Sequence, residues 1–409
     1  MLIKSLKLTS FLSYGPESEA VPLGPLNILI GPNGSGKSNF LEALSILQAA
    51  PGQLTKPIRD GGGIQDWLYK SESSAARRDA RIEALIANPQ GNNDFRYGLA
   101  LNQEGGRLAV RDEFLENEQA APGREDPYFY YRWNEGRPVL NTRGIGERKL
   151  VRETIKPDQS ILAQKRDADL YPEMTWLADQ FDAIRLYREW TFGRYATPRL
   201  QQRTDLPSDR LEQDYSNLAL VINRLKMHRP AWKQFMEGLR LVYEGIEDMH
   251  VQINDGGNAQ IFLIETSGPI PATRLSDGTL RYLALLTVLC DPAPPPLIVL
   301  EEPELGLHPD ILPQLAHLLS EASTRAQWIV TTHAPAFVDA FSERPENILV
   351  CERDPGGTRE PSESAEPVGA RGASGSRIER LDATDMAPWL EKYRLGDLWM
   401  RGQIGGTRW

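Results

Sequence analysis

The stretch Leu275–Glu304 reads LSDGTLRYLALLTVLCDPAPPPLIVLEEPE, and it decides how the rest of the chain should fold. A Ser-Asp-Gly turn is followed by an apolar run with helical spacing, and then by a second apolar run that ends in two glutamates. Ser276 can cap a helix that begins near Thr279. Gly278 completes a turn that leaves helix-terminal N–H groups free to face an anion. In isolation such a turn is a plain helix cap, but its place one helix before an acidic strand predicts a ligand site.

A phosphate-binding loop lies far upstream of this stretch. Residues 31–38 read GPNGSGKS, which fits G-x-x-x-x-G-K-[ST], and they connect an apolar strand at 26–30 to a helix. The glycines let backbone N–H groups approach phosphate oxygens where side chains would clash. Lys37 should reach the β- and γ-phosphates of ATP, and Ser38 should ligate Mg²⁺. The nucleotide-binding residues predicted here are Asn33, Gly34, Ser35, Gly36, Lys37, Ser38 and Asn39.

The two glutamates end the run Leu297–Leu300, which is apolar throughout, as expected for a strand covered on both faces. Adjacent residues on a strand point to opposite sides, so Glu301 and Glu302 should have different roles. We expect Glu301 to reach Mg²⁺ through a water molecule and Glu302 to act as general base on the attacking water. Two unpaired buried carboxylates would be costly, which favours a metal or a cationic partner beside them.

A histidine lies at the end of a later strand. His333 follows an apolar run at 328–330 and two threonines. At a strand end near the γ-phosphate, a histidine would sense that phosphate and hold the attacking water, so His333 is a candidate catalytic residue. A lone histidine is more often structural, and His228, His250 and His317 receive that interpretation.

The composition sets the class of protein. The chain has 409 residues, of which 40% are hydrophobic and 25% charged, so two or three domain-sized units with large cores are expected. A net charge of −10 does not favour nucleic-acid binding by total charge, although a local basic patch would still allow it. Cys290 and Cys351 lie in or beside apolar runs, which predicts buried thiols in a reducing compartment. No apolar run approaches the ~20 residues that span a bilayer. We therefore predict a soluble, cytoplasmic protein with no membrane partner.

The remaining pattern is that of an α/β protein. It predicts helices over 38–48, over 157–180 and, as a pair, between 216 and 243, a strand over 181–190, a hairpin of 246–254 with 259–265, and a mobile loop over 353–376. Four strand-like pieces separated by polar loops favour an antiparallel layer, and they cover 80–87, 95–102, 107–113 and 128–133.

The order of GPNGSGKSN, LSDGT, LIVLEEPELGLHP and IVTTHAP resembles ABC-type ATPase heads, and among these the RecF/SMC-like branch near the OLD-family ATPase domains. The resemblance implies a P-loop NTPase fold with a mixed parallel sheet flanked by helices, an antiparallel β layer and a small helical subdomain. It also implies the Walker A motif at 31–38, the signature at 275–279, Walker B at 297–302, the D-loop at 304–309 and a switch histidine, His333. On this basis we divide the chain into an N-terminal lobe at 1–156, a helical insert at 157–265 and a C-terminal lobe at 266–409.

Two positions fit the pattern of this family less directly. Family heads carry a Q-loop glutamine that contacts Mg²⁺ and the attacking water, and the candidate for that metal and catalytic role is Gln164, for which an ordinary surface glutamine is an equal alternative. The signature differs from LSGGQ at Asp277 and Thr279. An aspartate beside phosphate is repulsive unless it points away, so contact with the ATP of a second copy should rest on Ser276 and the backbone at Gly278.

The resemblance implies a function as well. We expect an ATPase that forms a head-to-tail homodimer around two ATP molecules, with Mg²⁺ as cofactor and a DNA-linked output in repair or anti-phage defence. An alternative is an ATP-gated regulatory subunit that controls a partner effector such as a nuclease, with slow turnover. A transporter subunit is disfavoured by Asn39 and the altered signature. A locally basic run could touch DNA phosphates, or could form a solvated face interleaved with acids; it consists of Arg185, Arg188, Arg194, Arg199 and Arg203.

Overall fold

A central six-stranded sheet organises the molecule. The computed structural model describes residues 1–70, 79–89, 91, 93–134, 137–142, 146–149, 155–354 and 375–405. The central sheet has the order β10-β15-β16-β3-β17-β18, in which β18 alone runs antiparallel to its neighbour. Its strands are β3 (Leu26–Ile30), β10 (Arg185–Tyr187), β15 (Leu297–Glu301), β16 (Gln327–Thr331), β17 (Ile348–Asp354) and β18 (Gly375–Arg380).

Both faces of this sheet are buried, each against its own hydrophobic core. On β15, Ile298 and Leu300 belong to one core, and Leu297 and Val299 belong to the other. Since successive side chains point to opposite faces, a strand covered on both sides must be apolar at every position. The expectation of a doubly covered strand before the two glutamates is therefore confirmed.

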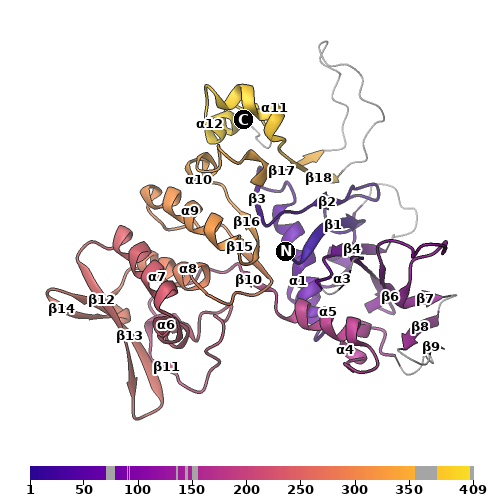
Figure 1. Ribbon diagram of the computed structural model, residues 1–409, viewed down its shortest axis with the longest axis horizontal. Coiled ribbons are helices and arrows are strands. Elements are labelled where there is room, and N and C mark those ends of the chain that lie inside the picture. The colour runs from indigo at the N-terminus through magenta and orange to yellow at the C-terminus, as the bar shows by residue number, and fades with distance from the viewer. Residues whose placement is uncertain are drawn as a thin grey trace.

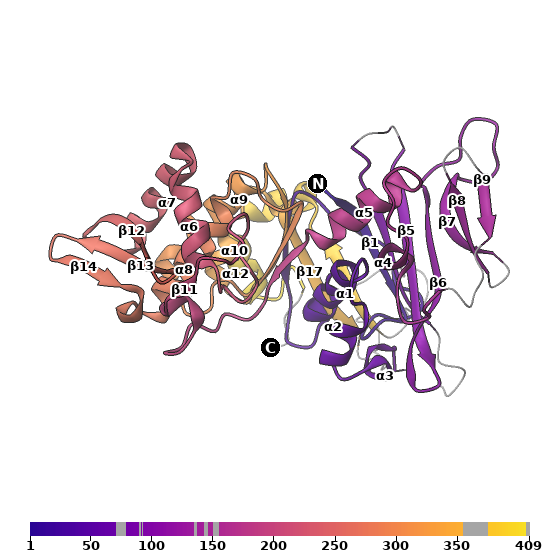
Figure 2. The same cartoon turned by 90° about the horizontal axis from the view of Figure 1, so that it is seen from below.

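One face carries the predicted antiparallel layer. Eight strands form this sheet in the order β2-β1-β4-β5-β6-β7-β8-β9, and they lie at the right-hand end of the molecule in Figure 2. They are β1 (Ile3–Thr9), β2 (Val21–Pro22), β4 (Ala80–Ile86), β5 (Phe95–Glu104), β6 (Arg107–Asn117), β7 (Phe129–Asn134), β8 (Arg137–Thr142) and β9 (Gly146–Lys149). The helices on this side are α1 (Lys37–Ala49), α2 (Thr55–Asp60), α3 (Ile64–Trp67), α4 (Ile161–Gln164) and α5 (Pro172–Asp182).

The opposite face carries helices and a second, smaller antiparallel sheet at the far end of the molecule (Figures 1 and 2). The helices are α6 (Leu218–Lys226), α7 (Arg229–Val242), α8 (Asp277–Leu289), α9 (Leu312–Ala322), α10 (Pro335–Asp339), α11 (Ala383–Leu390) and α12 (Leu395–Met400). The small sheet consists of β11 (Gln202–Arg203), β12 (Ile246–Asn254), β13 (Asn258–Glu265) and β14 (Gly268–Pro271). Short 3₁₀ turns are η2 (Thr197–Arg199), η3 (Ala272–Arg274), η4 (Pro309–Ile311) and η5 (Pro345–Asn347). The helix pair and the hairpin expected in this region are confirmed.

Two expected elements differ in extent. The helix over 157–180 is split into α4 and α5, because the side chain of Asp167 accepts bonds from nearby backbone N–H groups and Pro172 starts a new helix. The strand over 181–190 shortens to β10, since α5 continues to Asp182. Most of the loop expected over 353–376 lies outside the described residues.

Helix α12, near the end of the described residues, packs onto α10. In α12, the backbone N–H of Gly396 donates to Asp339 Oδ1 at 2.7 Å, and that of Leu395 donates to Ser342 Oγ at 3.0 Å. A side chain at Gly396 would collide with the carbonyl oxygen of Pro335. The segment is thus part of the fold. Cys290 and Cys351 are free, buried thiols, as predicted, and in the part of the chain described no helix is long and apolar enough to cross a membrane.

Candidate functional site

The phosphate loop is a left-handed glycine loop that leads into α1. Gly31, Gly34 and Gly36 all have positive φ, at 147°, 77° and 114°. A Cβ atom at Gly31 would overlap the carbonyl oxygen of Cys351, so β17 packs directly against the backbone of the loop at this glycine. Lys37 folds over the loop, and its Nζ donates to the carbonyl oxygens of Gly31, at 2.7 Å, and Pro32, at 3.1 Å. The backbone is therefore already shaped to surround an anion.

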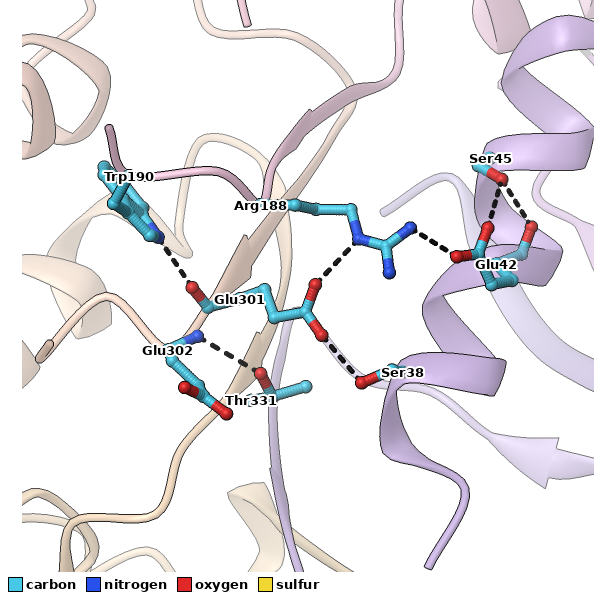
Figure 3. Close-up of polar contacts among 8 residues, drawn as sticks. All are labelled: Ser38, Glu42, Ser45, Arg188, Trp190, Glu301, Glu302 and Thr331. Atoms are coloured by element: carbon cyan, nitrogen blue, oxygen red, sulfur yellow. Dashed lines mark hydrogen bonds and ion pairs between the residues drawn. The ribbon is translucent and has the colours of Figure 1, made fainter. Parts of the chain in front are cut away.

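Ser38 and Glu301 meet across the carboxyl end of the sheet (Figure 3). Ser38 Oγ donates to Glu301 Oε1 at 2.7 Å, and Arg188 Nε donates to Glu301 Oε2 at 2.7 Å. The main-chain oxygen of Glu301 accepts a bond of 2.7 Å from Trp190 Nε1. A hydroxyl and a carboxylate are the hard oxygen donors that Mg²⁺ prefers.

These donors suit a metal that also binds the nucleotide. Among the described residues there is no group of three or more His, Cys, Asp or Glu side chains that could hold a metal alone. Mg²⁺ in ATPases is held by one or two protein oxygens together with substrate phosphates. Ser38 and Glu301 therefore fit Mg²⁺ that arrives with ATP, and bound Mg²⁺ would neutralise charge on the phosphates.

Glu302 lies beyond the end of the strand, so the expectation that Glu301 and Glu302 alternate as strand residues is wrong. Strand β15 ends at Glu301, and Glu302 has a φ of 48°, in the left-handed region that is costly for a residue with a side chain. Its N–H donates to the carbonyl oxygen of Thr331, at 3.1 Å, and to Thr331 Oγ1, at 3.2 Å. The two glutamates thus differ in environment because the backbone turns between them, and not because strand residues alternate.

Glu302 and His333 face each other. Glu302 Oε1 lies 3.4 Å from His333 Nε2. Burial and the nearby charge of Lys37 lower the pKa of His333, and the carboxylate of Glu302 only partly opposes them. Both effects favour the neutral imidazole at pH 7, which has one ring N–H to donate.

Most of the predicted residues line one cavity of about 120 Å³. Its walls are Asn33, Gly34, Gly36, Lys37, Ser38, Asn39, Glu302, Thr331 and His333. The amide of Asn39 is also bonded to Ser13 Oγ, at 2.7 Å, and this serine bonds in turn to Ser376. Asn39 therefore ties the start of α1 to the turn at Ser13 and, through it, to β18, as well as lining the cavity.

Gln164 is not brought to this cavity. Its side chain is bonded to the backbone just before it in sequence. Oε1 accepts from the N–H of Lys156 at 2.8 Å, and Nε2 donates to the carbonyl oxygen of Gln159 at 3.0 Å. The side chain that instead contacts Glu301 is Arg188, which sequence reasoning did not place in the site. Glu304 was predicted only as the first residue of the D-loop, but it also supports the site. Its buried Oε1 accepts from Thr332 Oγ1 at 2.6 Å and from the N–H of His333 at 2.8 Å, so it fixes the backbone at His333.

The signature turn lies outside the cavity. Ser276 caps α8 by accepting a bond of 3.0 Å from the N–H of Thr279. Asp277 pairs with Arg199, a buried residue that also donates to the carbonyl oxygens of Phe192 and Leu275. The charge of Asp277 is thus largely, but not wholly, compensated by Arg199, and Ser276 remains exposed.

The arginine run is mostly engaged inside the molecule. Arg188 and Arg199 hold Glu301 and the signature turn, Arg185 donates to backbone carbonyls, and Arg203 pairs with Asp205. Arg194 is exposed. Little of this run is therefore available as a DNA-binding patch.

The comparisons agree on the kind of protein. A family model described as "AAA domain, putative AbiEii toxin, Type IV TA system" matches residues 26–339. The DNA replication and repair protein RecF of Shouchella clausii is 28% identical over 101 residues, which cover 24% of this chain and 27% of that protein. The chain thus matches about a quarter of the length of that relative.

Solved structures show the fold. An Smc head with an extended coiled coil, bound to the C-terminal domain of ScpA and derived from Pyrococcus furiosus, aligns with a TM-score of 0.58 at 16% identity, over 96% of this chain and 99% of that one. An SmcHead bound to the C-winged helix domain of ScpA gives 0.57 at 16%, over 94% and 99%. The predicted P-loop fold of an SMC/ABC-type head is confirmed.

Proposed function

The chain belongs to this AAA-domain family, and on that premise we propose that it binds and hydrolyses ATP as a homodimer that closes head-to-tail around two nucleotides. The observation that carries the proposal is the separation of the two ATP-facing elements. Lys37, Ser38, Glu302 and His333 line one cavity, whereas the Ser276 turn is exposed elsewhere. A second copy would bring its turn to the ATP that the first copy holds.

Within one copy, each residue has a separate role. The phosphate loop binds the β- and γ-phosphates, and Lys37 exchanges its loop carbonyls for phosphate oxygens. Ser38 and Glu301 hold Mg²⁺. Glu302 accepts the proton of the attacking water, and neutral His333, 3.4 Å from it, orients that water and contacts the γ-phosphate.

The output of the cycle is proposed from the relatives. RecF relatives are named for DNA replication and repair, and the family description names a toxin–antitoxin system. We therefore place this ATPase in DNA maintenance or in defence, with DNA or an effector protein as partner. ATP-dependent DNA binding that weakens steeply with salt would support a DNA output. Absence of binding at low salt would favour the effector.

The substitution Glu302→Gln tests the ATPase. It keeps the size of the side chain and removes the base, so phosphate release should fall by ~10²–10⁴-fold while ATP-bound dimers persist in light scattering. Glu343→Gln, an exposed glutamate outside the cavity, is the matched control. Unchanged phosphate release in Glu302→Gln would remove this residue from its proposed role.

A further inference from the structure

The parallel register of the central sheet places Arg188 beside the metal-site glutamate. On the edge strand β10, Tyr187 pairs with Leu300 of β15, so the next residues along the two strands are Arg188 and Glu301. The carboxyl ends of parallel strands are where ligands bind in open α/β sheets. Arg188 therefore reaches the site from an element 113 residues away in sequence.

Arg188 holds two carboxylates at once (Figure 3). Its Nε donates to Glu301 at 2.7 Å, and its Nη1 donates to Glu42 Oε1 at 2.8 Å. Glu42 lies one turn after Ser38 on α1, and Ser45 Oγ is bonded to it as well. Burial lowers the pKa of Arg188, but its bonds to Glu301 and Glu42 outweigh burial, so the pKa is raised and the guanidinium stays charged.

Glu301 needs such a restraint. A glutamate has one more rotatable bond than the aspartate that is usual at this position, so its carboxylate would otherwise sample several positions. Here one oxygen accepts from Ser38 and the other accepts from Arg188. Each carboxylate oxygen has two lone pairs, so a metal or its bound water can still be accepted after both bonds form.

We propose that Arg188 is the positioning residue of the metal site: anchored on α1 through Glu42, it holds Glu301 against Ser38 so that the pair is ready for Mg²⁺ bound to ATP. The inference rests on the proposed function, because it requires Mg²⁺ to bind at Ser38 and Glu301. The charge of the guanidinium alone would oppose Mg²⁺, so positioning and simple repulsion predict opposite effects when Arg188 is removed.

The test measures nucleotide affinity without turnover. Calorimetry with the non-hydrolysable analogue AMP-PNP, in excess Mg²⁺ and in excess EDTA, gives the gain in affinity that Mg²⁺ confers. Arg188→Ala should reduce this gain about 10-fold, the usual effect of losing a residue that orients a metal ligand, with affinity in EDTA unchanged. The gain in Arg188→Lys should lie between those of the wild type and Arg188→Ala, since an ammonium lacks the planar fork that reaches both carboxylates. Arg194→Ala, on the same segment, is the control.

The outcomes separate the inference from the proposed function. An undiminished or larger gain in Arg188→Ala overturns the positioning role. A wild-type protein that shows no gain from Mg²⁺ overturns the metal site itself. On a Glu301→Ala background, Arg188→Ala should cause no further loss, because the two residues act through one bond. If Arg188→Ala does not fold, Glu42→Ala decides: it leaves the Glu301 bond in place, and a full wild-type gain there would contradict the anchoring.

Discussion

The two regions that would face ATP in the proposed dimer are assembled to different degrees. The half that would serve the nucleotide held by the same chain, here called the cis half, is assembled: Lys37 is bonded to its loop, and Ser38 is bonded to Glu301. The half that would serve the nucleotide of a second copy, the trans half, is a capped helix end whose Ser276 is exposed. This contrast is what the proposed dimer requires, because a chain that binds ATP in the cis half would need the trans half of a second copy to enclose it.

The two halves are nevertheless joined by one segment. Trp190 Nε1 donates to the carbonyl oxygen of Glu301, and the carbonyl oxygen of Trp190 accepts a bond of 2.8 Å from Arg281 of α8. Further along, Arg199 holds Leu275 and Asp277. Residues 188–199 therefore contact both Glu301 and the Ser276 turn. A substitution that moves one half should also move the other.

The largest expected effect comes from blocking the trans half. Ser276→Arg places a long side chain where the partner's nucleotide would lie, so ATP-dependent dimers should disappear while AMP-PNP still binds the monomer. Light scattering with and without AMP-PNP measures this. Ser267→Arg, on the exposed turn between β13 and β14, should dimerise normally. Normal dimers of Ser276→Arg would end the head-to-tail arrangement.

The cis half was largely predictable, because its signals are local. The phosphate loop and the acidic strand end are short motifs, and the loop has the positive φ angles that its glycines allow at Gly31, Gly34 and Gly36. Arg188 was missed because its role depends on the register between β10 and β15, which no local pattern encodes. Gln164 was misplaced for the related reason that a suitable residue type carries no information about which sheet edge it reaches.

In the trans half, the sequence indicated the cap but not its support. Asp277 raised the problem of an aspartate beside phosphate, and the structure answers it with Arg199, 78 residues away in sequence. Arg199 was read only as a member of a basic run. Its burial, which distinguishes it from exposed Arg203, follows from the packing of η2 against η3 and cannot be seen in composition.

The next largest effect should come from removing that support. Arg199→Ala would leave the carbonyl oxygens of Phe192 and Leu275 without their donor, which should lower the free energy of unfolding by about 3 kcal/mol. Arg203→Ala, whose exposed side chain pairs with Asp205, should cause a much smaller loss. Urea denaturation measures both. Equal losses in the two variants would show that Arg199 is not the support of the trans half.

An effect of similar size should appear as a change of stability with pH, on the side of the central sheet that carries α1 and β6. Glu113 on β6 is buried and accepts bonds from Tyr97, Ser160 and Ile161, and burial raises its pKa from 4.5 to about 7 despite these donors. Between pH 4.5 and about 7, the folded state therefore holds a proton on Glu113 that the unfolded chain has lost. This stabilisation is complete below pH 4.5 and is lost as the pH rises through about 7.

The loss should amount to about 3 kcal/mol, as the rise in the pKa of Glu113 from 4.5 to about 7 implies. Urea denaturation across this pH range should show it in the wild type and not in Glu113→Gln. Ile161 begins α4, which packs against α5, and α5 packs against α1. The loss of protection against hydrogen exchange at high pH should therefore appear first in these helices, beside the cis half. An identical pH slope in Glu113→Gln would assign the dependence to other groups.

The smallest effect concerns the charge that remains in the trans half. Asp277 is paired with Arg199, but 67% of its side chain is exposed, so part of its negative charge should still face the phosphates of a partner's ATP. Asp277→Asn should tighten AMP-PNP-dependent dimerisation by about 2-fold, as expected for an exposed and largely neutralised charge. Analytical ultracentrifugation measures the dimer constant, and high salt should remove the difference. Asp255→Asn, on the β12–β13 turn, should change nothing. If Asp277→Asn weakened the dimer instead, the aspartate would be a contact of the closed interface, and the trans half would be more complete than its exposure suggests.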